Sequence, residues 1–157
     1  MRRRRVVLAV ALCALLGLWL VGKLLSPPPY VTELTYRQQL DGGIEQVHVL
    51  QGSGLGFEVQ GCGYYAQLYS YYLLPGENLL PPERLSVGDL RGYEQGRSLA
   101  WKVRELGRWP GGESKSPAWS LQVTLEDGTS YERSGDGPPP EKLDAILELF
   151  PDPPPVE

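Results

Sequence analysis

The longest apolar stretch of the chain lies at its beginning, where residues 6–22 carry no charged side chain. With the next leucines the stretch extends to residue 25, and about 20 helical residues cross a hydrocarbon core of about 30 Å. The span includes Val6, Leu18, Trp19 and Gly22, with the indole ring near the outer end, where it is favoured. Lys23 can snorkel to the interface. The pattern therefore predicts a transmembrane helix over residues 6–25.

The charges flanking this stretch predict its orientation. Arg2–Arg5 precede it and only Lys23 follows, so the positive-inside rule makes residues 1–5 a cytoplasmic basic tail. Three alternatives stay open: a cleaved signal peptide, a lipid-modified Cys13 and a buried core helix. The pattern favours an uncleaved, single-pass signal-anchor in the cell membrane. The prolines of residues 26–29 then form a stiff spacer to an extracytoplasmic domain.

Beyond the spacer, apolar residues recur at every second position, which is typical of β-strands. Residues 31–38 and 44–50 alternate in this way, with the turn signal Asp41-Gly42-Gly43 between them. Three glycines break the alternation within residues 51–59, before Phe57 and Val59 resume it. We expect these strands to form an antiparallel meander.

Five tyrosines between residues 64 and 72 continue this meander. In a strand, Tyr65, Gln67, Tyr69 and Tyr71 lie on one face, and Tyr64, Ala66, Leu68, Ser70 and Tyr72 on the other. Tyrosine packs well in strands and is also a stiff, amphipathic anchor in binding surfaces, so both roles stay open. The candidate binding surface consists of Tyr64, Tyr65, Tyr69, Tyr71 and Tyr72, together with Trp101 and Trp109.

Residues 99–106 fit two patterns. Apolar residues at positions 99, 103 and 106 suit a helix, whereas those at 99, 101 and 103 alternate like a strand. Ser98 as an N-cap and Gly107 as a stop favour the helix. The turn-rich residues 75–98 are not assigned to any element.

The last third of the chain has the clearest pattern. Residues 119–125 alternate, Asp127-Gly128 is a tight-turn signal, and residues 129–134 return as the second arm of a hairpin. Apolar residues at 143, 146, 147 and 150 then have helical spacing. The predicted fold is α+β: an antiparallel meander sheet over residues 30–150, covered by one or two helices including a C-terminal one. Residues 151–157 are expected to form a flexible tail.

This hairpin and helix carry a resemblance. The segment from Trp119 to Phe150 resembles a pattern in small bacterial domains of unknown function, in which a tryptophan-led hairpin with a DG turn precedes a glycine–proline break and a terminal helix. This chain has three prolines where one is usual, and its middle third does not clearly match. The resemblance implies an α+β fold and no catalytic residues.

Length and charge narrow the function classes. The 157 residues provide room for one domain. Residues 30–157 hold 10 of the 15 basic residues and all 19 acidic ones, which leaves a charge of −9 and disfavours nucleic-acid binding. Cys62 is the only cysteine beyond the apolar stretch, so no disulfide can form within the domain. A buried, small apolar role is expected for it.

Catalytic and metal-binding patterns are weak. His48, the only histidine, is expected to face solvent or to form hydrogen bonds, although a pair with Cys62 across adjacent strands is geometrically feasible. The glycines of residues 52–56 lack a following lysine or helix and indicate a turn or bulge rather than a phosphate loop. No C-x-x-C or H-x-x-x-H spacing occurs.

These observations predict a binding or interaction module of the bacterial envelope, with no catalytic residues, cofactor or metal. Its partner would be another envelope protein or a cell-wall polymer. Two alternatives stay open: a small hydrolase of envelope polymers that uses a carboxylate pair, and a structural accessory subunit of a membrane complex.

Overall fold

The computed structural model describes residues 2–26, 28–53, 63–77, 84–108 and 117–155. Its elements in chain order are α1 (Arg2–Leu25), β1 (Val31–Gln39), the short 3-10 helix η1 (Asp41–Gly43), β2 (Glu45–Ser53), β3 (Tyr65–Leu73), β4 (Ser86–Arg91), α2 (Tyr93–Gly107), β5 (Trp119–Leu125), β6 (Ser130–Gly135) and α3 (Glu141–Leu147). The predicted positions of Phe57, Val59, Cys62 and Trp109 lie outside the described residues.

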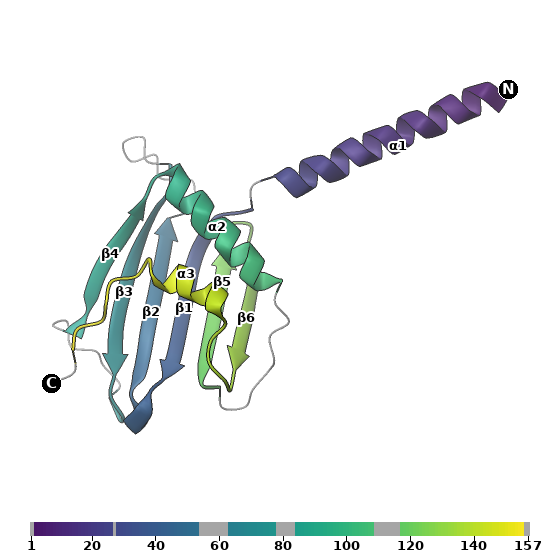
Figure 1. Cartoon of the computed structure of the whole chain (residues 1–157). Coiled ribbons are helices and arrows are strands. Elements are labelled where there is room, and N and C mark those ends of the chain that lie inside the picture. The colour runs from purple at the N-terminus through teal and green to yellow at the C-terminus, as the bar shows by residue number, and fades with distance from the viewer. Residues whose placement is uncertain (1, 27, 54–62, 78–83, 109–116, 156–157) are drawn as a thin grey trace.

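The six strands form one antiparallel sheet in the order β4-β3-β2-β1-β5-β6. The first four strands are the predicted meander, and the β5–β6 hairpin joins the sheet beside β1. Figure 1 shows α2 and α3 lying across the same face of this sheet, and no helix among the described residues lies on the other face. The predicted α+β architecture is therefore confirmed, with both helices on one side.

The core lies between the sheet and these helices. Rows of side chains that pair across the strands point into it, including Leu34, Leu50 and Leu68, which are at most 1% exposed. From α2, Leu99, Val103 and Leu106 complete the same cluster. Burying such apolar surface stabilises the fold by about 25 cal/mol per Å².

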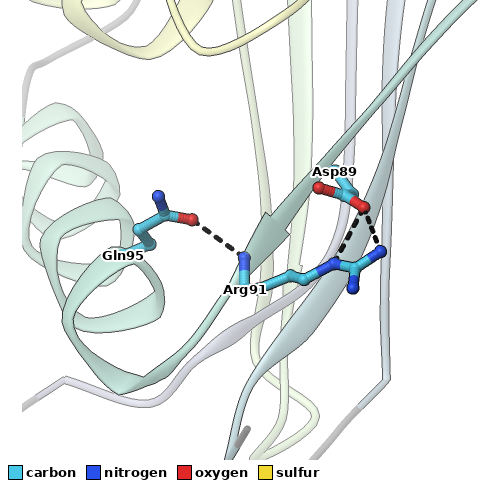
Figure 2. Close-up of polar contacts among 3 residues, drawn as sticks. All are labelled: Asp89, Arg91 and Gln95. Carbon is cyan, nitrogen blue, oxygen red and sulfur yellow. Dashed lines mark hydrogen bonds and ion pairs between the residues drawn. The ribbon is translucent and has the colours of Figure 1, made fainter.

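Helix α2 confirms the helical pattern at residues 99–106 and its end at Gly107, but it begins earlier than expected. The helix starts at Tyr93 after Gly92, whose φ of 93° suits glycine, and Ser98 lies inside it rather than at its N-cap. The predicted cap was wrong because the helix has its N-cap at Gly92, which has no side chain to signal it. In the first turn, the Gln95 side-chain oxygen accepts a hydrogen bond from the Arg91 N–H at 2.8 Å (Figure 2).

The C-terminal hairpin and helix follow the sequence pattern closely. Gly128 in the β5–β6 turn has a φ of 82°, and the Asp127 carboxylate accepts the Thr129 N–H at 2.9 Å. After α3, Phe150 is buried at 7% exposed, as its helical spacing predicted. The chain stays packed beyond this point, because Pro151 lies against Gly88, where β4 has no side chain. Residues 151, 153 and 154 are half-buried, and the flexibility of residues 151–157 stays a prediction.

Helix α1 covers most of the apolar stretch and projects away from the sheet (Figure 1). Its described side chains, from Val10 to Gly22, are exposed, with Leu18 at 70% and Trp19 at 60%. Among the residues whose side chains are described, no helix has both the length and the apolar character needed to cross a membrane.

Candidate interaction surface

The tyrosines of β3 divide between the two faces of the sheet, as the alternation predicted. Tyr64, immediately before the strand, lies in the core at 3% exposed. Its hydroxyl donates a hydrogen bond to the Val31 carbonyl at 2.9 Å, and its ring stacks on Tyr30 with centroids 5.2 Å apart. Burial raises the pKa of its phenol, because the charged form loses its hydration. Tyr64 therefore contributes to packing.

The uncovered face of the sheet carries an aromatic patch, which we define as Val49, Tyr65, Tyr69, Tyr71 and Val87. Residues directly opposite in an antiparallel pair share a face, and Tyr69 lies opposite both Val49 in β2 and Val87 in β4. Val87 is 58% exposed on the edge strand. The patch therefore spans three adjacent strands.

The tyrosines of this patch are held in place by their neighbours. Tyr71 lies opposite Val47, which is fully buried although it lies outside the main core cluster. Burial raises the pKa of the Tyr71 phenol, with nearby Arg37 acting in the opposite direction. The Tyr69 hydroxyl donates to the Gln67 side-chain oxygen at 2.6 Å. All three rings are half-buried.

Charged pairs border the patch on two sides. Arg37 and Glu45 form an ion pair at 3.3 Å between β1 and β2. On β4, two guanidinium nitrogens of Arg91 contact one Asp89 oxygen at 2.9 and 2.6 Å (Figure 2). The Arg91 guanidinium also lies 5.5 Å from the centroid of the Tyr65 ring. The result is an apolar and aromatic centre with a polar rim.

The remaining predicted site residues lie elsewhere. Tyr72 is half-buried and lies on the opposite side of β3 from Tyr69 and Tyr71. Trp101 is 37% exposed on α2, which covers the other face of the sheet. The structure therefore brings together Tyr65, Tyr69 and Tyr71.

The two valines that complete the patch were not predicted from the sequence. Val87 falls in a turn-rich segment that the pattern did not assign, and only the pairing of β4 with β3 brings it beside Tyr69. Val49 was recognised as a strand residue, and its alternation with His48 was the signal that could have placed it on the outer face.

His48 lies on the covered side of the sheet, at 4% exposed. Its Nδ1 lies 2.7 Å from Ser70 Oγ, its Nε2 lies 2.9 Å from the Gln46 amide nitrogen, and its ring centroid lies 5.1 Å from that of Phe150. Burial lowers the pKa of His48 to about 4, although Asp152 acts to raise it. The hydrogen-bonded alternative for this residue is confirmed, and the closed ring packing leaves Ser70, which is 0% exposed, without access to a substrate.

Three of the hollows on the described surface are lined by one acidic side chain each: Asp127, Glu45 or Glu132. A general acid and base pair needs two carboxyl groups facing one substrate, which none of these three hollows provides. Among the described residues, no group of three or more histidine, cysteine, aspartate or glutamate side chains is arranged to hold a metal ion.

Comparison with known proteins finds no matching family model, curated protein or solved structure. The resemblance of residues 119–150 to small bacterial domains therefore stays a prediction.

Proposed function

We propose that this chain is a single-pass membrane protein that displays an extracytoplasmic interaction domain, which binds another protein of the cell envelope through the aromatic patch. The observation that carries the proposal is the gathering of three tyrosines and two valines on the sheet face that no described helix covers.

The anchor is supported by the sequence and by the exposure of α1. The apolar stretch over residues 6–25 follows four arginines, and the described large apolar side chains of α1 are at least 51% exposed. Such side chains are stable in a hydrocarbon environment and costly in water. A cytoplasmic N-terminus follows from the arginines.

The composition of the patch favours a protein partner over a wall polymer. Protein interfaces commonly have an apolar, aromatic centre and a polar rim, and tyrosine is enriched among the residues that contribute most to affinity. Here aliphatic Val49 and Val87 flank Tyr69, and the Arg37–Glu45 and Arg91–Asp89 pairs form the rim. The valines offer no hydrogen bonds to a sugar, but they fit the apolar surface of a protein.

The test compares capture by matched variants of the full chain. Detergent-solubilised wild type is immobilised beside Tyr69→Ser/Tyr71→Ser and beside Gln122→Ser/Ser130→Ala, a control on the polar half of the same face. We expect one protein to be retained stoichiometrically by the wild type and the control. The tyrosine variant should bind it at least about tenfold more weakly, because each such anchor contributes on the order of 1 kcal/mol or more.

Folding of each variant is checked by circular dichroism and thermal melting. Equal retention by the tyrosine variant with unchanged folding would contradict the role of the patch. Loss of the melting transition in this variant would show that Tyr69 and Tyr71 act in packing, as Tyr64 does.

A further inference from the structure

Helix α2 and its C-cap residue carry a basic and aromatic stripe, which we define as Arg97, Trp101, Arg104 and the C-cap Arg108. The spacing of four, three and four residues places these side chains along one flank of the helix. Arg97 and Arg108 are exposed, Trp101 is 37% exposed, and the Arg104 guanidinium lies 5.1 Å from the centroid of the Trp101 ring. This cation–π pair joins two members of the stripe.

The neighbours of α2 show which way this flank faces. The buried side, with Leu99 and Leu106, meets the sheet. On one flank Lys102 donates a hydrogen bond from Nζ to the Ala145 carbonyl of α3 at 3.0 Å. On the other flank Arg104 lines a hollow together with Ser26, Pro28 and Pro29, the residues that follow α1. The stripe thus lies on the side of the domain where α1 joins it.

The charge of this stripe is opposite to that of the domain as a whole. Residues 97–108 contain four of the ten basic residues found in residues 30–157 and one of the 19 acidic residues, Glu105. Such a local excess of positive charge in an acidic domain attracts anionic partners to this side of α2.

We propose that the stripe docks α2 on the anionic lipid headgroups of the membrane that holds α1; this inference rests on the proposed anchor. Only four residues, 26–29, separate α1 from the domain, and even fully extended as a polyproline helix at about 3.1 Å per residue they would span no more than about 12 Å, so α2 stays within reach of the headgroups. Arginine is attracted to an anionic leaflet, and tryptophan favours the interface between headgroups and acyl chains. Arg104 lines the hollow beside the spacer, so it lies where α1 joins the domain.

Docking through α2 has a consequence for the interaction surface. The stripe lies on the helix layer, whereas the aromatic patch lies on the opposite face of the sheet (Figure 1). A domain held to the bilayer by α2 therefore keeps the patch clear of the lipid and accessible to a partner.

The test measures how close Trp101 lies to lipid. The full chain is reconstituted in nanodiscs of phosphatidylcholine, alone or mixed with phosphatidylglycerol, with plain or brominated acyl chains. Bromine quenches nearby indole fluorescence, and subtraction of the Trp101→Phe signal isolates Trp101 from the other three tryptophans. We expect at least twofold stronger quenching of Trp101 in the anionic nanodiscs, and a decline of this difference at high salt.

Two variants with equal loss of charge give the control. Arg97→Gln/Arg108→Gln should abolish the difference between the two lipid compositions, whereas Arg37→Gln/Arg91→Gln, on the open sheet face, should retain it. Incorporation into nanodiscs with equal Trp101 quenching in both lipids overturns the docking and leaves the anchor standing. Failure of the full chain to incorporate overturns the anchor and, with it, the docking.

Discussion

At the scale of single residues, the proton on His48 can be placed from its partners. The amide nitrogen of Gln46 can only donate, so His48 Nε2 accepts, and the ring proton resides on Nδ1 and is donated to Ser70 Oγ. A second proton on Nε2 would point at the N–H of the Gln46 amide, so that two donors would face each other. It would also place a positive charge next to the Phe150 ring. The folded domain therefore holds this histidine neutral.

This arrangement predicts that the folded domain loses stability in acid. The pKa of His48 falls from 6.5 to about 4 on folding, so between these values the unfolded state binds a proton that the native state does not. The free energy of unfolding should decline as the pH falls from 6.5 to 4, by on the order of 3 kcal/mol from this residue. Urea unfolding of the full chain in detergent, across this pH range, measures the decline.

His48→Gln is the matched variant, because it retains hydrogen-bonding groups without a titrating ring. The carboxylates titrate in both proteins, so the difference between their pH profiles isolates His48. Parallel profiles between pH 6.5 and 4 would show that the histidine is not held neutral.

At the scale of elements, α2 approaches the sheet closely through Gly96, which is buried in the first turns of the helix. A Cβ placed on this glycine would lie 2.5 Å from Cγ and 2.9 Å from Cβ of Tyr64. These are the inner atoms of the tyrosine side chain, which cannot move aside without its backbone. The helix therefore rests on the Tyr64 ring at this glycine.

Gly96→Ala should destabilise the domain although alanine is the better helix former by about 1 kcal/mol. The overpacking against Tyr64 costs typically about 1–3 kcal/mol, so the net loss in the free energy of unfolding lies within about 0–2 kcal/mol. We expect the upper part of this range because the added Cβ would lie 2.5 Å from Tyr64 Cγ. Urea unfolding measures the loss. Ser98→Ala, an exposed position in the same helix, should change stability by less than about 0.5 kcal/mol. A stabilised Gly96→Ala variant would refute the close approach.

At the scale of the whole molecule, the domain has two different faces and one tether. The helix layer carries the basic stripe beside the spacer, the open sheet face carries the aromatic patch, and α1 leaves the domain on the side of the stripe. This separation allows one face to contact the bilayer while the other binds a partner.

The topology of the chain is tested in cells whose outer layers have been opened and whose cell membrane is intact. We expect the full chain to stay in the membrane fraction after alkaline carbonate, because an inserted helix is not released by loss of charge contacts. Added protease should digest the domain and leave the N-terminal tail protected. Release by carbonate would contradict the anchor, whereas a protected domain and a digested tail would reverse the orientation.

Much of the fold follows from local patterns. The strands β1, β2 and β3, the Asp127-Gly128 turn and the apolar positions of α3 were predicted because each is encoded within a few residues. β4 and the beginning of α2 were not, because a half-exposed edge strand has weak alternation and Gly92 gives no capping side chain. The tertiary contacts of Tyr64 also exclude it from the surface that the tyrosine pattern suggested.

The sequence by itself determined that Tyr65, Tyr69 and Tyr71 share a face, because side chains in a strand alternate with an invariant period of two. It also determined the apolar N-terminal stretch and the uneven charge. Only the tertiary structure decided that no described helix covers this face, that Val87 joins it from β4, and that the His48 ring packs against Phe150. These features depend on which side of the sheet α2 and α3 pack, and packing between segments distant in the chain is set by the core as a whole.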